Sequence, residues 1–278
     1  MWIVRGFKAG RSATYLAKAQ GISRQMVYEL INGYNKEGAD FLSDKKIGRP
    51  CLPISGAFAE KVEKLREETD YGSEKLHFVL TKDGFSVSQR QIQKILDLKG
   101  LTEPCKKRRG QRKYVKYQWP ISNYMWHTDW SFIDGKWYIT FTDDRSRRIM
   151  AASDFDNATE ENAIFLLHQA ILTNEVSPYI LLSDKGTQFY NSKRNKKGER
   201  TLSLFEQELE ELGIQFWTSR RNHPQANGKQ EKLFDTMKKW LRKHRDKNLQ
   251  DFVKWYNDER IHHALDYKTP EEVYIENL

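Results

Sequence analysis

The chain has 278 residues, more than one average domain, and is long enough to bury a substantial core in two or three domains. Its 47 Lys and Arg exceed its 38 Asp and Glu, and the formal net charge of +9 favours a polyanionic partner without identifying one. No apolar run approaches the roughly 20 residues of a membrane span. The two cysteines, Cys51 and Cys105, have no partner at zinc spacing and are interpreted as reduced thiols. We therefore expect a soluble cytoplasmic protein with no membrane partner.

Two short helices are predicted near the N-terminus, at residues 12–20 and 24–34, with Ser23 as the N-cap of the second. Three residues fall at the spacings that a helix-turn-helix needs. A small residue lets the two helices approach, a glycine makes the turn, and an apolar residue packs the second helix against the first: Ala17, Gly21 and Val27. The exposed side of the second helix is predicted to contact DNA through Arg24, Gln25 and Tyr28. The alternative is a plain helical hairpin whose polar residues are solvated.

A second helix-turn-helix is predicted further along, from helices at 57–66, 73–80 and 89–98, the last of them capped by Ser88. Gly48–Pro50 separates the two modules, and Arg49 is predicted to contact DNA in the minor groove. Residues 105–117 contain no acidic residue. We interpret this segment either as a solvated linker or as a segment that neutralises the DNA backbone. The DNA contacts predicted there are Lys106, Lys107, Arg108 and Arg109.

The remaining chain predicts a mixed sheet with helices on its faces, which is an α/β domain. Strands are expected at 125–133 and 136–142, joined by an Asp134-Gly135 hairpin turn, and at 149–155, 178–183 and 214–218. Helices are expected at 159–174, at 202–212 and from 229 to about 244. The predicted domains are therefore 1–48, 49–104, a basic linker at 105–120, and a core at 121–278.

Three carboxylates occupy positions from which distant segments can converge: Asp129 within a strand, Asp184 at the end of one, and Glu231 in the first turn of a helix. Converging carboxylates suit a hard, oxygen-seeking cation such as Mg²⁺. An arbitrary acid is far more often a solvated surface charge. Glu231 is chosen over Asp235 because Asn227 would cap its helix with Gln230 as the capping-box partner, which fixes its place near the helix start.

Other polar residues near these carboxylates can be interpreted as structural or as functional. Asp143 and Asp144 could reach the same cleft. The preferred interpretation is that they stabilise the turn that follows them, at residues 145–148. His127 shares a strand face with Asp129, and a satisfied structural histidine is preferred over a supporting role. Lys238 and Arg242 share the helix face of Glu231 and are predicted to contact DNA ends, the alternative being a solvated basic face.

The segment from Met125 to Tyr274 resembles the catalytic core of the DDE transposases of bacterial and archaeal insertion sequences, relatives of retroviral integrases. The resemblance is carried by Trp126–Asp129, Ser183–Phe189, His223–Glu231, Tyr256–Leu265 and Thr269–Glu272. It implies a ribonuclease H-like core in which Asp129, Asp184 and Glu231 are the catalytic residues and hold two Mg²⁺ ions, with Mn²⁺ as a substitute. The paired N-terminal helical modules resemble those of the same enzymes.

The activity implied by this resemblance is cleavage at transposon 3′ ends followed by strand transfer into target DNA. Double-stranded DNA would be the partner, in a nucleoid-associated dimer or higher assembly. The chain departs from the family pattern in having 46 residues between Asp184 and Glu231, with a basic insertion at 192–201. Two alternatives remain: a catalytically silent regulator derived from such an enzyme, and a structure-selective nuclease of the same fold.

Overall fold

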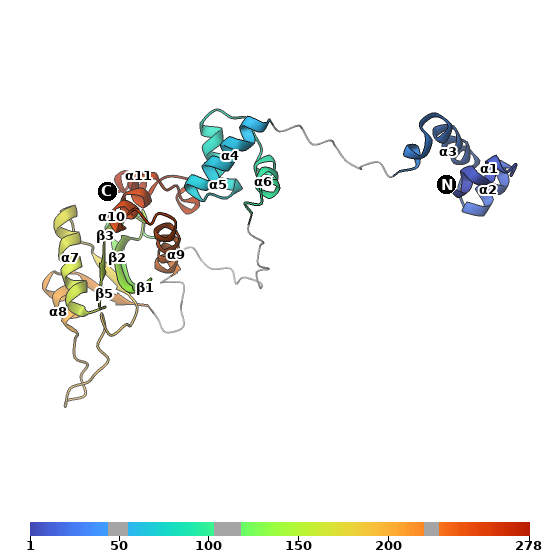
Figure 1. Cartoon of the computed structure of the whole chain (residues 1–278). Coiled ribbons are helices and arrows are strands. Elements are labelled where there is room, and N and C mark those ends of the chain that lie inside the picture. The colour runs from blue at the N-terminus through green and yellow to red at the C-terminus, as the bar shows by residue number, and fades with distance from the viewer. Residues whose placement is uncertain (44–54, 103–117, 220–227) are drawn as a thin grey trace. The chain divides into compact units, whose positions relative to one another are not determined.

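The structure is a computed structural model of the whole chain, and it describes residues 1–43, 55–102, 118–219 and 228–278 (Figure 1). It divides into two compact units, Met1–Ser55 and Gly56–Leu278. The predicted DNA contacts at Arg49 and at Lys106, Lys107, Arg108 and Arg109 lie outside the described residues, as do both cysteines. Within the described ranges, no helix is long and apolar enough to cross a lipid bilayer.

The first unit is a small helical bundle that contains the predicted helix-turn-helix. Its elements are α1 (Trp2–Lys8), α2 (Ala13–Gln20), α3 (Arg24–Glu37) and the 3₁₀ helix η1 (Gly38–Leu42). The Ser23 hydroxyl accepts the backbone N–H of Met26 at 3.1 Å, so the predicted N-cap is confirmed. Gly21 adopts the left-handed conformation (φ 65°) at the end of α2, and the Val27 side chain of α3 is fully buried. Helix α1 completes the bundle and was not predicted.

Gly33 marks a close approach within this first unit. A Cβ at Gly33 would lie 2.2 Å from the ring of Phe41, so a Gly33→Ala variant forces that ring to move. We expect overpacking of about 1–3 kcal/mol, partly offset by about 1 kcal/mol of better helix propensity. Hydrogen exchange of the α3 amides in the full chain should therefore be faster in the variant. A Gly56→Ala control, where a Cβ meets nothing within 4 Å, should leave exchange in α4 unchanged or slower.

The second unit begins with three helices, α4 (Gly56–Thr69), α5 (Ser73–Lys82) and α6 (Gln89–Leu98). Val62, Leu76 and Ile92 contribute fully buried side chains, one from each helix. Ser88 starts α6 with a reciprocal capping box, in which its own N–H donates to the Gln91 side chain at 2.9 Å. The predicted helical pair 73–80 and 89–98 is therefore present, with α5 extending two residues further.

The core of the second unit is a five-stranded mixed sheet in the order β3-β2-β1-β4-β5. Its strands are β1 (Met125–Ile133), β2 (Lys136–Asp143), β3 (Ile149–Phe155), β4 (Ile180–Ser183) and β5 (Gln215–Thr218). β1, β2 and β3 are antiparallel neighbours, whereas β4 pairs in parallel with both β1 and β5. Positive φ at Asp134 (48°) and Gly135 (95°) gives the β1–β2 turn the twist of a two-residue hairpin. The predicted mixed sheet is confirmed.

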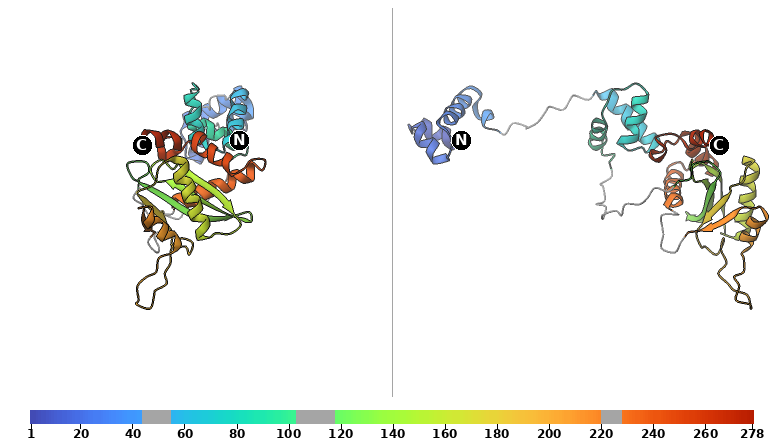
Figure 2. Two further views of the ribbon diagram at one scale, coloured as in Figure 1. Left: turned by 90° about the vertical axis from the view of Figure 1, so that its left-hand side faces the viewer. Right: turned by 180° about the vertical axis from the view of Figure 1, so that it is seen from behind.

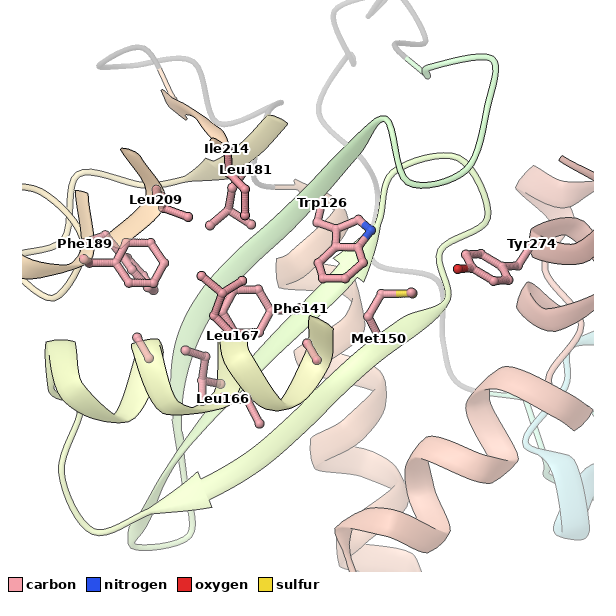
Figure 3. Close-up of a cluster of buried hydrophobic side chains, with 14 residues drawn as sticks. Trp126, Phe141, Met150, Leu166, Leu167, Leu181, Phe189, Leu209, Ile214 and Tyr274 are labelled. Atoms are coloured by element: carbon pink, nitrogen blue, oxygen red, sulfur yellow. The ribbon is translucent and has the colours of Figure 1, made fainter. Parts of the chain in front are cut away.

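Helices cover both faces of this sheet (Figures 1 and 2). On one face α7 (Glu160–Asn174) and α8 (Leu204–Glu211) pack on the apolar cluster around Trp126, Phe141 and Leu181 (Figure 3). On the other face α9 (Gly228–Lys243) and α10 (Leu249–Lys254) pack on Ile133 and Ile149. Because strand side chains alternate, Asp129 projects from the same face as Ile133, which is the α9 face.

The C-terminal segment follows α10 and returns to the sheet. It consists of a π-helix (Trp255–Glu259), a 3₁₀ helix η3 (His263–Leu265) and α11 (Pro270–Glu276). Asn257 is buried and binds both backbone groups of Ile149, accepting its N–H at 2.9 Å and donating to its carbonyl at 3.0 Å. The predicted family motif at Tyr256–Leu265 therefore fastens the C-terminal segment to β3.

Candidate active site at the strand ends and helix α9

The parallel pairing of β1 and β4 ends two residues before Asp129 on one strand and two residues before Asp184 on the other. The pairing register runs through Trp126–Leu181 and His127–Leu182, and the two aspartates each follow two residues later. Asp184 lies one residue beyond β4, on the continuation of this register. Neighbouring strands are about 4.8 Å apart, so two side chains level on adjacent strands and on one face are close neighbours. Two of the three predicted catalytic carboxylates therefore lie on neighbouring segments of the sheet.

Local hydrogen bonds fix the orientation of both carboxylates. The Asp129 Oδ1 accepts the backbone N–H of Trp130 at 2.8 Å, and the Asp184 Oδ1 accepts that of Gly186 at 2.8 Å. A Cβ at Gly186 would lie 2.9 Å from this Asp184 oxygen and 2.8 Å from Gln188. Glycine at this position therefore leaves room for the carboxylate in the turn that follows β4.

Helix α9 is attached to β1 and β2 through Gln230, which is fully buried. Its amide nitrogen donates to the His127 carbonyl at 2.8 Å and to the Thr142 hydroxyl at 2.7 Å, and its amide oxygen accepts from Thr140 at 3.1 Å. Thr140 is the residue paired with Asp129 across the β1–β2 ladder. The Gln230 side chain therefore binds the sheet, whereas its predicted capping-box partner, Asn227, lies outside the described residues, so the capping box stays a prediction.

Glu231 directly follows this anchor, in the first turn of α9, and its side chain is exposed. The structure therefore holds the backbone of Glu231 next to the strand that carries Asp129. Among the described residues, no group of three His, Cys, Asp or Glu side chains is already arranged as a metal site. The three carboxylates nevertheless offer the all-oxygen ligand chemistry that Mg²⁺ and Mn²⁺ favour. Their joint binding of metal remains a prediction.

A buried ionic cluster lies beside these residues and joins the end of β2 to the start of α9. The Asp144 carboxylate, fully buried, binds the Nε2 of His127 at 2.6 Å and forms an ion pair with the Lys229 ammonium. His127 is 4% exposed and Lys229 18% exposed. The second His127 nitrogen, Nδ1, is buried without a hydrogen-bond partner in the part of the chain that the structure describes.

The charges in this cluster shift one another's protonation. Burial alone would raise the pKa of Asp144, but the hydrogen bond from His127 and the charge of Lys229 hold that pKa well below its usual range. Burial lowers the pKa of His127, which is therefore neutral at pH 7. Burial also lowers the pKa of Lys229 to about 8, with Arg147 adding to the effect and Asp144 opposing it. An ionised Asp144 thus holds a desolvated Lys229 two residues before Glu231.

Asp143 serves the following turn, as the preferred interpretation held, whereas the Asp144 side chain binds residues outside that turn. Asp143 accepts the backbone N–H of Asn123 at 2.7 Å and both the N–H and hydroxyl of Ser146, at 2.7 and 2.6 Å. Asp144 uses its other oxygen to accept the N–H of Trp119 at 2.9 Å. Burial raises the pKa of Asp143. All four carboxylate oxygens have protein partners, so neither residue presents a spare oxygen to a metal.

The predicted DNA contacts within the described residues are exposed, but they differ in their partners. Arg24, Gln25 and Tyr28 are exposed on α3, where Gln25 donates to Glu29 at 3.1 Å. Lys238 is exposed on α9, whereas Arg242 forms a salt bridge with Asp134 at 2.7 Å in the β1–β2 turn. The Arg242 guanidinium is therefore already partly neutralised.

The Lys229–Asp144–His127 cluster is the part of the site that sequence reasoning missed. A lysine two residues before Glu231 is visible in the sequence, but its partner lies 85 positions away. No helical or strand periodicity links residues at that separation. The one available signal was the pair of adjacent aspartates at the end of a predicted strand, which suggested a structural task without naming the residues they bind.

The sequence matches family models over most of its length. Two models described as integrase core domain match residues 120–224 and 212–270, and a model described as helix-turn-helix domain matches residues 3–50. The first of these matches contains Asp129 and Asp184, and the second contains Glu231. The helix-turn-helix match covers the first unit, in which α2 and α3 form that motif.

Two curated proteins are similar in sequence. An integrase of Spiroplasma virus SpV1-C74, the ORF3 product, is 30% identical over 151 residues, which cover 50% of this chain and 42% of that protein. The transposase of insertion sequence element IS904 from Lactococcus lactis is 24% identical over 243 residues, 77% of this chain and 92% of that protein. The chain thus spans less than half the length of the first relative and nearly all of the second.

Solved structures with a similar fold include two retroviral proteins. The catalytic core domain of BIV integrase is 20% identical, with a TM-score of 0.43 over 55% of this chain and 95% of that one. A chain of the simian T-cell lymphotropic virus intasome is 16% identical, with a TM-score of 0.47 over 77% of this chain and 74% of that one. Because the two integrase core matches together run from residue 120 to residue 270 of 278, behind a helix-turn-helix domain, the chain belongs to the integrase core family and resembles the transposases of insertion sequences.

Proposed function

We propose that the chain is a transposase that binds transposon ends and catalyses metal-dependent 3′-end cleavage and strand transfer. The observation that carries this proposal is the parallel pairing of β1 with β4, which ends two residues before Asp129 and two residues before Asp184. Gln230 adds a reason to include Glu231, because it fastens the first turn of α9 to the partner strand of Asp129. The first unit supplies the end-binding surface through Arg24, Gln25 and Tyr28 on α3.

The three carboxylates would together hold two metal ions. Asp129 lies on the central strand β1, between β4, which leads to Asp184, and β2, which Gln230 of α9 contacts. From this position Asp129 would be a ligand of both ions. Asp184 and Glu231 would each complete one side. When bound, Mg²⁺ or Mn²⁺ would activate the attacking oxygen and stabilise the leaving oxygen of the phosphodiester. The local hydrogen bonds from Trp130 and Gly186 hold the two aspartates in a fixed orientation before metal arrives.

The partner follows from the proposed reaction. Double-stranded DNA would supply both the transposon end and the target, and two ends must be joined in one event. We therefore propose that the chain acts as a dimer or a higher assembly on DNA. The basic excess of the chain, a net charge of +9, favours the backbone contacts that such an assembly requires.

Strand transfer from pre-cut ends tests the proposal directly. The wild-type chain and an Asp184→Asn variant are compared with the ends of the element, a target duplex and Mg²⁺ or Mn²⁺. Joined product is expected from the wild type alone, while both proteins bind the ends equally. Equal product from both would remove the catalytic assignment. Cleavage of branched DNA without preference for the ends would instead indicate a structure-selective nuclease, and end binding without any chemistry a regulator.

A further inference from the structure

A basic cleft runs along the outer side of α9, where this helix faces the end of α4 and the start of α5. Its volume is about 280 Å³. The helical module meets the C-terminal segment beside it, where Phe78 stacks on Tyr267 with ring centroids 4.6 Å apart. The Tyr71 hydroxyl also accepts the Ile261 N–H at 3.0 Å. The cleft is therefore built from two parts of the second unit that contact each other directly.

Five cationic side chains line the cleft: Lys75, Lys232, Lys239, Lys243 and Arg260. Three acids line it as well, Glu68, Asp70 and Asp235, and Asp70 is paired with Arg66 at 3.2 Å. The lining therefore has an excess of positive charge even before the Asp70 carboxylate is discounted.

The positive charges of the cleft are poorly neutralised. Lys75 donates to the Ile261 carbonyl and Lys243 to the Glu67 carbonyl, and neither acceptor carries a formal charge. Lys232 and Lys239 are exposed and form no salt bridge with any residue that the structure describes. Burial, aided by the charge of Arg260, lowers the pKa of Lys75 to about 7. An anion entering the cleft would be attracted to the charged lysines and would favour the protonated form of Lys75.

Three of the lysines form a stripe on α9. Lys232, Lys239 and Lys243 are separated by seven and four residues, so they share one helix face about 100° from the face of Glu231, Lys238 and Arg242. The stripe is about 16 Å long at 1.5 Å per residue, a length over which one DNA strand carries roughly five phosphates. This face is distinct from the predicted contact face, where Asp134 already pairs with Arg242.

We propose that the rim of this cleft binds the phosphate backbone of double-stranded DNA, with Lys232 and Lys239 as the exposed contacts. The inference rests on the proposed function, because it takes DNA as the substrate. The cleft is far too small to admit a duplex, so only the backbone of one strand meets its rim. Such contacts read no sequence and add to the recognition made by the first unit.

The salt dependence of DNA binding tests this assignment. Each lost phosphate contact lowers the slope of log affinity against log salt by about 0.9, so a Lys232→Gln/Lys239→Gln variant of the full chain should lose about 1.8. Binding is measured by fluorescence anisotropy with a labelled duplex in EDTA, which keeps the result independent of catalysis. A Lys196→Gln/Lys197→Gln variant removes the same charge from an exposed loop and should keep the wild-type slope.

Two further variants sharpen the test. A Lys232→Arg/Lys239→Arg variant preserves the charge and should restore the slope, and Asp235→Asn removes an acid from the cleft and should tighten binding. A glutamine variant whose slope equals that of the loop control would overturn the cleft assignment. If the wild type still performs strand transfer in that case, the proposed function stands alone. A wild-type chain that binds no DNA would overturn both.

Discussion

A Lys229→Met variant is expected to lose about 3 kcal/mol of the free energy of unfolding of the second unit. Removing one partner of a buried ion pair typically costs ~3–5 kcal/mol, because the remaining charge is left desolvated and unpaired. The lower end applies here, since Asp144 keeps its hydrogen bonds to His127 at 2.6 Å and to the Trp119 N–H at 2.9 Å. The loss should appear in urea denaturation followed by tryptophan fluorescence.

The control is Lys238→Met, which removes an exposed lysine from the same helix and should change stability by no more than about 0.5 kcal/mol. An Asp144→Asn change placed on top of Lys229→Met removes the unpaired charge and should recover part of the loss. Equal unfolding midpoints for Lys229→Met and Lys238→Met would show that the ion pair contributes nothing to the fold. A loss with no recovery in the double variant would point to packing of the lysine stem instead.

Elements governed by local chemistry could be predicted from the sequence. The β1–β2 hairpin and its Asp134-Gly135 turn are found where they were expected, because this dipeptide favours two successive positive φ angles. Ser88 also begins α6 at the predicted residue, since its hydroxyl binds a backbone N–H only three positions away. Strand β3 has the predicted bounds, Ile149–Phe155.

Elements governed by distant partners could not be predicted in the same way. Helix α1 has no side-chain cap, so no capping residue marks its start in the sequence. Its stability comes from packing on α2 and α3. The π-helix at Trp255–Glu259 contains Asn257, whose partner Ile149 is 108 residues away. Gln230 fits a capping box by spacing alone, yet its partners on β1 and β2 lie about 90 to 100 residues earlier in the chain, separations that no local sequence rule covers.

The candidate site shows the same division. Alternation along a strand places Asp129 and His127 on one face, and the end of an apolar run marks Asp184. The parallel pairing of β1 with β4, which ends two residues before each of these aspartates, is a property of the sheet order, in which β4 lies beside β1 rather than beside β3. Sequence patterns give each strand its faces but not its neighbours, so the alignment of the two carboxylates emerges only in the folded sheet.

An Asp129→Asn variant is expected to lose strand transfer by at least about 10²–10³-fold while binding DNA normally. A metal ion supplies several kcal/mol of transition-state stabilisation, and each 1.36 kcal/mol is tenfold in rate. Asparagine keeps the shape of the side chain and an oxygen that can still accept the Trp130 N–H, but it removes the negative charge that would attract two cations. Mn²⁺ binding to the DNA-free protein, measured by calorimetry, should weaken in parallel.

The matched control is Asp156→Asn, which removes the same charge from an exposed residue just beyond β3. It should retain both activity and the wild-type Mn²⁺ isotherm. An Asp129→Asn protein that joins ends at the wild-type rate would exclude Asp129 from the chemistry, whatever its place in the sheet. Loss of activity with an unchanged Mn²⁺ isotherm would mean that Asp129 holds no metal ion in the DNA-free protein, and that its charge is needed only after the substrate has bound.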